Sequence, residues 1–224
     1  MKYFNEAYNQ FFKELAANNN RDWYHANKSR YEKDVKKPFE VFVNDLIAAI
    51  AKEEPAMAHL QSKDAIFRIF RDTRFSNDKT PYKLYSSAVL SPLGRKDMEM
   101  PGTYIQLGVG EIWIGGGSYM PDKVQIEKIR TALIQAPEVV ESLQRDKNFI
   151  RLFGEIKGDK NKRLLKPFSE WTEKMPLIAN KQFYYMAEYH DAEQLVLQDD
   201  FLEFVMEHYH AAKDWQDFLR AALK

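Results

Sequence analysis

The hydrophobic positions at the start of the chain repeat with helical spacing. Over residues 4–16 they recur every three or four residues, which is typical of one apolar face of a helix. They are Phe4, Tyr8, Phe11, Phe12 and Leu15. A run of three asparagines follows, in which Asn20 is expected to cap a second helix that begins near Arg21.

A second apolar stripe begins after Pro38, a residue that either breaks a helix or occupies its first turn. The stripe consists of Phe39, Phe42, Val43, Leu46 and Ile50. Residues 1–57 are therefore predicted to be helical.

The pattern changes in the middle of the chain, where β-branched and aromatic residues stand in short runs between turn residues. Residues 63–120 are therefore predicted to be mainly strand. The strands are expected over residues 65–71, 84–90, 103–109 and 112–119. Gly110 and Glu111 separate the last two strands and indicate a two-residue hairpin loop.

Helical spacing returns after residue 121, so the last part of the chain is predicted to be helical with one further strand, at residues 182–189. The expected helices cover residues 122–136, 137–148, 199–211 and 214–223, and residues 154–166 are expected to form a surface loop. Helices, then antiparallel strands, then helices indicate an α+β fold. We expect one domain over residues 1–224, with an antiparallel sheet of about five strands flanked by N- and C-terminal helices.

Composition limits the classes of function. The 33 basic and 33 acidic residues cancel, which argues against general nucleic-acid or membrane-surface binding. The absence of cysteine excludes disulfides and thiolate chemistry. His208 and His210 are two residues apart in a helical pattern, so they face apart, and no metal site or cofactor is expected. With no secretory signal or long apolar run, we expect a cytoplasmic protein.

One stretch departs from this neutral background, and we call residues 68–83 the basic segment. It carries five cations against two carboxylates. The cations are Arg68, Arg71, Arg74, Lys79 and Lys83, and the carboxylates are Asp72 and Asp78. Several arginines displayed on one loop suit a phosphate or carboxylate ligand, but the same charges would also fit a lattice of ion pairs that only holds the loop. Both interpretations stay open.

Other residues extend the hypothesis of an anion site. Ser76 and the loop N–H groups are candidate donors, and so is Tyr82. Arg21 and Lys28 are candidates to join the cluster, beside the start of their helix, although a solvated helix face is the simpler interpretation.

Two classes of function follow from this pattern. In the first, the basic segment holds a small phosphorylated or carboxylated ligand, and if the protein is an enzyme, Asp72 or Asp78 is the acid/base candidate. In the second, the segment is an interaction module that docks an acidic protein partner or a nucleic-acid backbone. The sequence favours neither an enzyme nor a pure binder, and it indicates no oligomeric state.

The glycines at 115–117 precede a predicted helix but fit no nucleotide-binding spacing. Within a strand, such glycines more often mark the close approach of another backbone, and space for a ligand is the alternative.

These motifs resemble the family catalogued as domain of unknown function 2461. Residues 71–83 match the core of its signature, and residues 18–23, with Lys28 and Tyr31, are similar to its Asn-Asn-x-x-x-Trp start. The glycines at 115–117 and the pair Ile129 and Arg130 resemble its glycine-rich strand and following helix. The family's name assigns no activity, so the resemblance implies kinship and not a function.

Overall fold

The computed structural model describes residues 1–96 and 100–224. The contacts within it group the chain into two compact units, and each is described by itself. Unit 1 comprises residues 1–96, 104–113 and 188–206; the described part of unit 2 comprises residues 100–103, 114–187 and 207–224. The single-domain organisation stays a prediction.

The helical start of unit 1 follows the predicted pattern. It consists of α1 (Glu6–Ala17), α2 (Arg21–Ala26), α3 (Lys28–Arg30), a π-helical turn (Tyr31–Lys36), α4 (Lys37–Ala51) and α5 (Ser62–Ala65). The side chain of Asn20 accepts a hydrogen bond from Trp23 N and so caps α2. Pro38 occupies the first turn of α4, directly after the π-helical turn, and the backbone stays helical from one to the other, so Pro38 does not break the helix.

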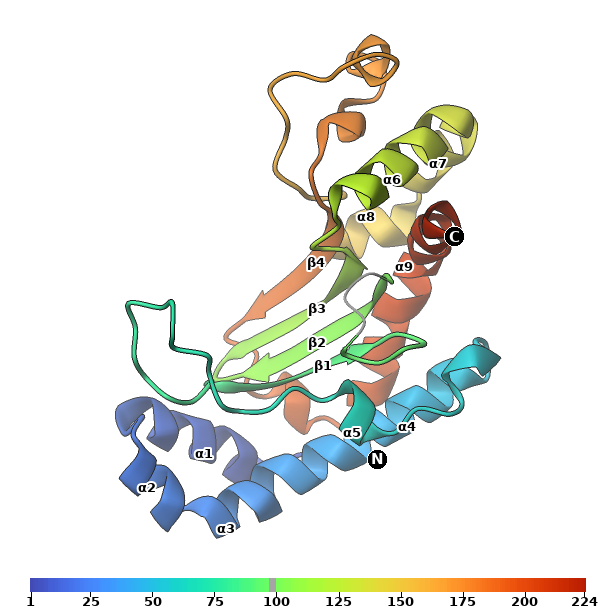
Figure 1. Ribbon diagram of the computed structural model, residues 1–224. Helices are drawn as coiled ribbons and strands as arrows, with labels where there is room; N and C mark the ends of the chain where they lie inside the picture. The colour runs from blue at the N-terminus through green and yellow to red at the C-terminus, as the bar shows by residue number, and fades with distance from the viewer. Residues whose placement is uncertain (97–99) are drawn as a thin grey trace. The chain divides into compact units, whose positions relative to one another are not determined.

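The sheet confirms the α+β class. Its strands are β1 (Tyr85–Leu90), β2 (Gly102–Gly108), β3 (Glu111–Ser118) and β4 (Phe183–His190), paired in the order β1-β2-β3-β4 (Figure 1). The described chain has four strands rather than the expected five or so, because residues 65–71 do not form a regular strand.

A change of register explains this missing strand. Ile66 faces Ala88 in one isolated antiparallel bridge, and Phe70 faces Tyr82 in another. The two bridges differ in register by two residues, so no continuous ladder connects them. The 65–71 segment therefore stays irregular, although it remains tied to the chain that leads into β1.

Three other boundaries differ from the sequence-based expectation. The hairpin loop is Val109-Gly110, not Gly110-Glu111, and Gly110 adopts the positive φ of 69° that the turn requires. The helix predicted over residues 137–148 ends at Gln144, and Asp146 caps a new helix, α8 (Lys147–Phe153). The two closing helices are one, α9 (Phe201–Leu223), because no helix breaker lies between residues 211 and 214.

The core of unit 1 lies between the helices and one face of the sheet. Every apolar residue predicted for the α1 and α4 stripes is at most 1% exposed. Tyr8 of α1 donates a hydrogen bond to Leu107 O of β2 at 3.2 Å, and Phe42 of α4 lies 5.2 Å from Phe201, centroid to centroid. β1, the strand that follows the basic segment, pairs with β2 and so belongs to the same packed sheet.

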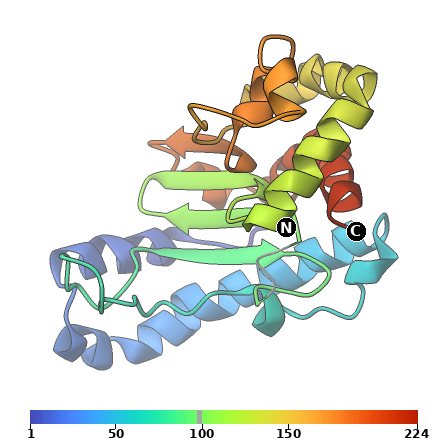
Figure 2. The same ribbon diagram turned by 45° about the horizontal axis from the view of Figure 1, so that its top comes forward.

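Unit 2 contains α6 (Lys123–Gln135), α7 (Pro137–Gln144) and α8, followed by the 3₁₀ turns η3 (Phe168–Trp171) and η4 (Pro176–Ala179). Figure 2 shows the chain changing direction between α6 and α7, where Pro137 opens the second helix. Tyr185 of β4 donates a hydrogen bond to Gln216 Oε1 at 3.2 Å, and its ring lies 5.5 Å from that of Phe149.

The glycines at 115–117 lie inside β3, where neighbouring strands approach closely. A Cβ atom on Gly116 would stand 2.5 Å from Gly102 O and 2.6 Å from Tyr185 Oη. A Cβ on Gly115 would stand 2.3 Å from Tyr185 O. Backbone approach accounts for these glycines, as the sequence pattern indicated.

Candidate functional site

The basic segment leaves the irregular 65–71 stretch, forms a projecting loop and returns to β1 (Figure 1, teal). Its two sides are joined by a hydrogen bond from Arg71 N to Pro81 O at 2.9 Å and one from Lys83 N to Ile69 O at 2.8 Å. The base of the loop is therefore built like the end of a hairpin, and the tip is displayed beyond it.

Asn19, in the connection between α1 and α2, clamps the returning side of the loop. Its Nδ2 donates to Tyr82 O at 2.9 Å, and its Oδ1 accepts from Tyr82 N at 3.1 Å. One amide side chain thus pairs with both backbone groups of Tyr82, as a neighbouring strand would. This explains why an asparagine is needed in the helix connection.

At the tip, Arg71 is satisfied from within the loop. Its Nη1 contacts Asp78 Oδ2 and Thr80 Oγ1, and it also donates to Thr80 O at 3.1 Å. The Asp78 carboxylate accepts from Thr80 N at 2.9 Å as well. The hydrogen bonds from the Thr80 backbone, and then from Arg71, lower the pKa of Asp78 to about 2.

Arg74 and Lys79 also have acceptors in the loop. Arg74 donates to both carboxylate oxygens of Asp72, from Nε at 3.0 Å and from Nη2 at 2.7 Å. The Lys79 amine donates to Thr73 O at 2.8 Å. The hydrogen bonds from Arg74 lower the pKa of Asp72 to about 2. Carboxylates with such low pKa values are weak proton acceptors at neutral pH, which weighs against both as acid/base groups.

Arg68 and Lys83, at the base of the loop, differ from these three cations. Neither makes a side-chain hydrogen bond or ion pair within the described part of the chain, and Arg68 is exposed. The half-buried Lys83 amine stands 5.3 Å from the centroid of the Phe67 ring and 5.7 Å from that of Tyr85. Burial, and then the charge of Arg68, lowers the pKa of Lys83.

Tyr82 packs inward. Its side chain is 2% exposed and stacks on Tyr24 of α2, with ring centroids 4.2 Å apart and an interplanar angle of 21°. Burial raises the pKa of Tyr82, and the nearby charge of Arg21 opposes that rise. Phe70 completes the aromatic group at 5.4 Å from Tyr82. Tyr82 thus anchors the loop through its ring.

The remaining predicted site residues make fewer contacts. Arg21 is exposed near Tyr82, and Lys28 is exposed at the start of α3. Ser76 is half-buried at the loop tip. Among residues 1–96 and 100–224, neither Lys28 nor Ser76 makes a side-chain hydrogen bond to the segment. The structure therefore places Arg21 near Tyr82, but in the described residues neither Arg21 nor Lys28 makes a hydrogen bond to the basic segment.

Sequence reasoning missed the aromatic partners of Lys83, which are Phe67 and Tyr85. Gly108 of β2 lies between Tyr85 of β1 and Glu111 of β3. Trp113 is two residues beyond Glu111 in β3, so its side chain is on the same face of the sheet as that of Tyr85. Trp113 Nε1 is buried and has no hydrogen-bond partner in the described chain. Lys83 and Tyr85 are two residues apart where the chain enters β1, a spacing that puts side chains on one face of a strand, and this was the available signal in the sequence.

Two negative findings limit the chemistry of the described residues. In residues 1–96 and 100–224, no group of three or more His, Cys, Asp or Glu side chains could hold a metal ion. None of the helices in the same part of the chain has the length and apolar character needed to cross a membrane.

Comparison with known proteins identifies the kinship of the chain. A search of curated proteins finds no match. The family model described as Conserved hypothetical protein (DUF2461) matches residues 7–218, which include the Asn19 clamp, the basic segment and the buried Arg130 of α6. This chain therefore belongs to the DUF2461 family.

Proposed function

We propose that this protein binds a small ligand carrying a phosphate or carboxylate group at the base of the basic segment, through Lys83 and Arg68. The supporting observation is the environment of Lys83. Its amine is half-buried on two aromatic rings beside a second cation, and no carboxylate partner lies within the described residues. A charge in that position is stabilised when an anion arrives.

The contacts at the tip leave Lys83 and Arg68 as the cations of the basic segment that are available to a ligand. Arg71, Arg74 and Lys79 already have acceptors in the loop, so an incoming anion would have to compete with them. Arg68 and Lys83 make no hydrogen bond or ion pair within the described residues, although Arg68 is close enough to Asp72 to help lower the pKa of that carboxylate. The aromatic rings of Phe67 and Tyr85 offer an apolar wall to the rest of the ligand.

The test is thermal unfolding with increasing phosphate at constant ionic strength, for wild type, Lys83→Met and the matched control Lys79→Met. Each variant removes one lysine charge from the same loop. Phosphate at about ten times its Kd should raise the Tm of wild type and Lys79→Met by about 2–5 °C, by mass action on the folded state. Lys83→Met should lose this rise. An equal rise in all three proteins would refute the proposal.

A second candidate function has its own supporting observation. Phe75, at the tip of the loop, is 95% exposed, and the Arg74 guanidinium lies 5.7 Å from the centroid of its ring. An exposed aromatic residue next to cations suits the docking of an acidic protein partner. In that case Phe75→Ala would abolish the interaction while leaving the phosphate response of Lys83 intact. Salt-sensitive binding to arbitrary DNA would instead favour the nucleic-acid version of this module.

A further inference from the structure

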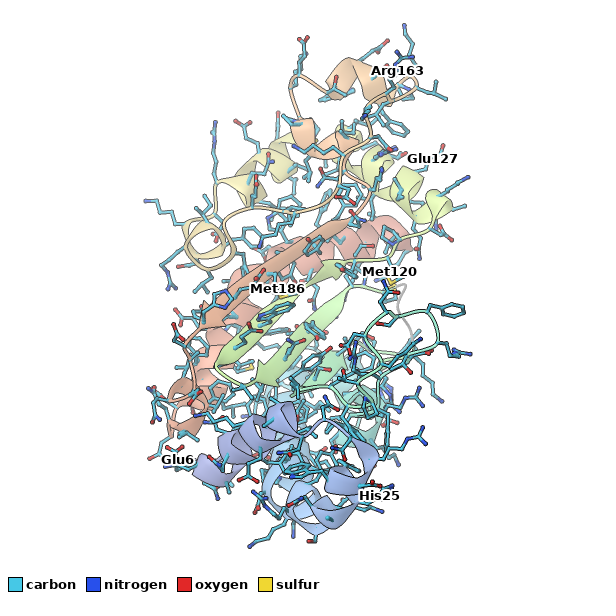
Figure 3. All side chains as sticks on the ribbon, turned by 90° about the vertical axis from the view of Figure 1, so that its left-hand side faces the viewer. Glu6, His25, Met120, Glu127, Arg163 and Met186 are labelled. Carbon is cyan, nitrogen blue, oxygen red and sulfur yellow. The ribbon has the colours of Figure 1, made fainter. Side chains whose placement is uncertain are left out.

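We infer that unit 2 contains a second binding site, a cleft built around Arg130 that accepts a small molecule joining an anionic group to an apolar body. The cleft has a volume of about 790 Å³, within the range of small-molecule sites. It lies between the start of α6 and the loop that precedes η3. Figure 3 labels three of its lining residues, Met120, Glu127 and Arg163, along one side of unit 2.

The first supporting feature is the buried charge of Arg130. Its side chain is only 9% exposed, and it donates from Nε to Ile178 O at 2.8 Å and from Nη2 to Asn180 O at 2.9 Å. These carbonyls orient the guanidinium but supply no counter-charge. Burial lowers the pKa of Arg130, and no carboxylate offsets that effect.

The geometry of Arg130 leaves part of its guanidinium available. Nε and Nη2 are occupied by backbone carbonyls, and the Phe168 ring lies 6.0 Å from Cζ. Nη1 makes no hydrogen bond within the described residues, and it is not among their buried unpaired atoms. A held guanidinium with a free N–H edge in a cleft is suited to an anionic oxygen.

The second feature is the excess of positive charge around Arg130. Five cations line the cleft with a single carboxylate, that of Glu127. The cations are Lys123, Arg130, Arg163, Lys166 and Lys181. Lys166 is paired with Glu170 at 2.9 Å, and the other four have no ion-pair partner within the described chain. In a protein of zero formal charge, this local excess favours an anionic ligand.

The third feature is the apolar part of the same lining. Tyr119, Met120 and Leu165 are 59%, 68% and 86% exposed, although their side chains are large and hydrophobic. Phe168 and Ile126 continue this surface into the cleft. An inorganic anion would leave these side chains in water, whereas a ligand with an aromatic or aliphatic body would cover them.

The test uses phenyl phosphate as probe and the full-length Lys83→Met protein as background, so that the site at the basic segment does not contribute. Binding is measured by calorimetry and by the NMR signal of the Arg130 Nε–H group. Phenyl phosphate should bind one site and shift that signal. Inorganic phosphate and phenol should each bind at least about tenfold more weakly, because each lacks one half of the recognition.

Variants at exposed lining residues avoid damage to the fold. In the same background, Arg163→Met combined with Lys181→Met should weaken phenyl phosphate binding by about tenfold or more, since it removes two charge-assisted contacts. The control is Lys162→Met, which removes one exposed charge next to Arg163 but outside the cleft lining.

Three results would overturn the inference. The first is equal binding by the double variant and the Lys162→Met control. The second is binding of phenol or inorganic phosphate as tight as that of phenyl phosphate. The third is association with anionic lipid vesicles without any binding of phenyl phosphate, which would make the cleft a membrane contact. None of these outcomes depends on whether phosphate binds near Lys83.

Discussion

The tip of the basic segment and the surroundings of Arg130 both carry many cations, but their physical states are opposite. At the tip, the side chain of Arg74 is 77% exposed and donates two hydrogen bonds to Asp72. In unit 2, the guanidinium of Arg130 is buried and oriented by two carbonyls, without a carboxylate. Exposed ion pairs contribute little to the stability of the fold, whereas a buried charge without a counter-charge lowers it.

This difference shows that a count of charges along the chain does not locate a binding site. The basic segment has the denser run of cations, but Arg71, Arg74 and Lys79 already donate hydrogen bonds to acceptors within the loop. The cations available to a ligand are those without an ion-pair partner in the described residues: Lys83 and Arg68 at the base of the loop, and Lys123, Arg130, Arg163 and Lys181 in unit 2.

The largest expected effect is that of Arg130→Met on stability. The substitution leaves Ile178 O and Asn180 O without their donor, so we expect the free energy of unfolding to fall by about 2–4 kcal/mol. Denaturant unfolding measures this value, with Arg74→Met as the exposed control, for which we expect a change within about 0.5 kcal/mol. Equal losses of unfolding free energy in the two variants would show that the buried and the exposed arginine contribute alike to stability.

A smaller loss is expected when the clamp on the basic segment is removed. Asn19→Ala deletes both hydrogen bonds to Tyr82 and should destabilise the protein by about 1–3 kcal/mol. Asn19→Asp keeps the acceptor for Tyr82 N and loses only the donor to Tyr82 O, which sharpens the test. If denaturant unfolding shows no loss for either variant, the ion pairs of the tip hold the loop by themselves.

Lys83→Met should stabilise the protein, because it removes a charge from an apolar and cationic environment. The pKa of Lys83 is lower in the folded state, so the unfolded chain binds more protons and wild-type stability should rise as pH increases towards about 10.5. Lys83→Met should lack that part of the rise, and unfolding curves at several pH values measure it. A destabilised Lys83→Met would mean that the amine has a structural role.

The smallest effect concerns Asp72, whose ion pair with Arg74 is exposed. Asp72→Asn should unfold like wild type at neutral pH, because an exposed pair contributes little. The lowered pKa of Asp72 makes its contribution fully present above about pH 4 and lost as pH falls towards 2. The variant lacks this small contribution, so its acid limb should be flatter than that of wild type only by the small difference seen at neutral pH. A clear loss of stability at neutral pH would show that the ion pair holds the loop.

Local sequence patterns determined much of the fold. The α1 and α4 stripes, the cap at Asn20 and the hairpin around Gly110 depend on neighbours a few residues apart, so periodicity and turn preferences predicted them correctly. The position of the basic segment was also visible, because its charges are consecutive in the chain.

Only the tertiary structure decided which of these charges are free and where the strands end. Residues 65–71 had the composition of a strand, but a register change of two residues kept them irregular. In the sequence, nothing distinguishes Arg130 from other helix residues. In the fold it is buried and donates hydrogen bonds to the carbonyls of Ile178 and Asn180, which are about 50 residues away in the chain. Burial and ion pairing depend on contacts between distant parts of the chain, and local propensity carries no information about such contacts.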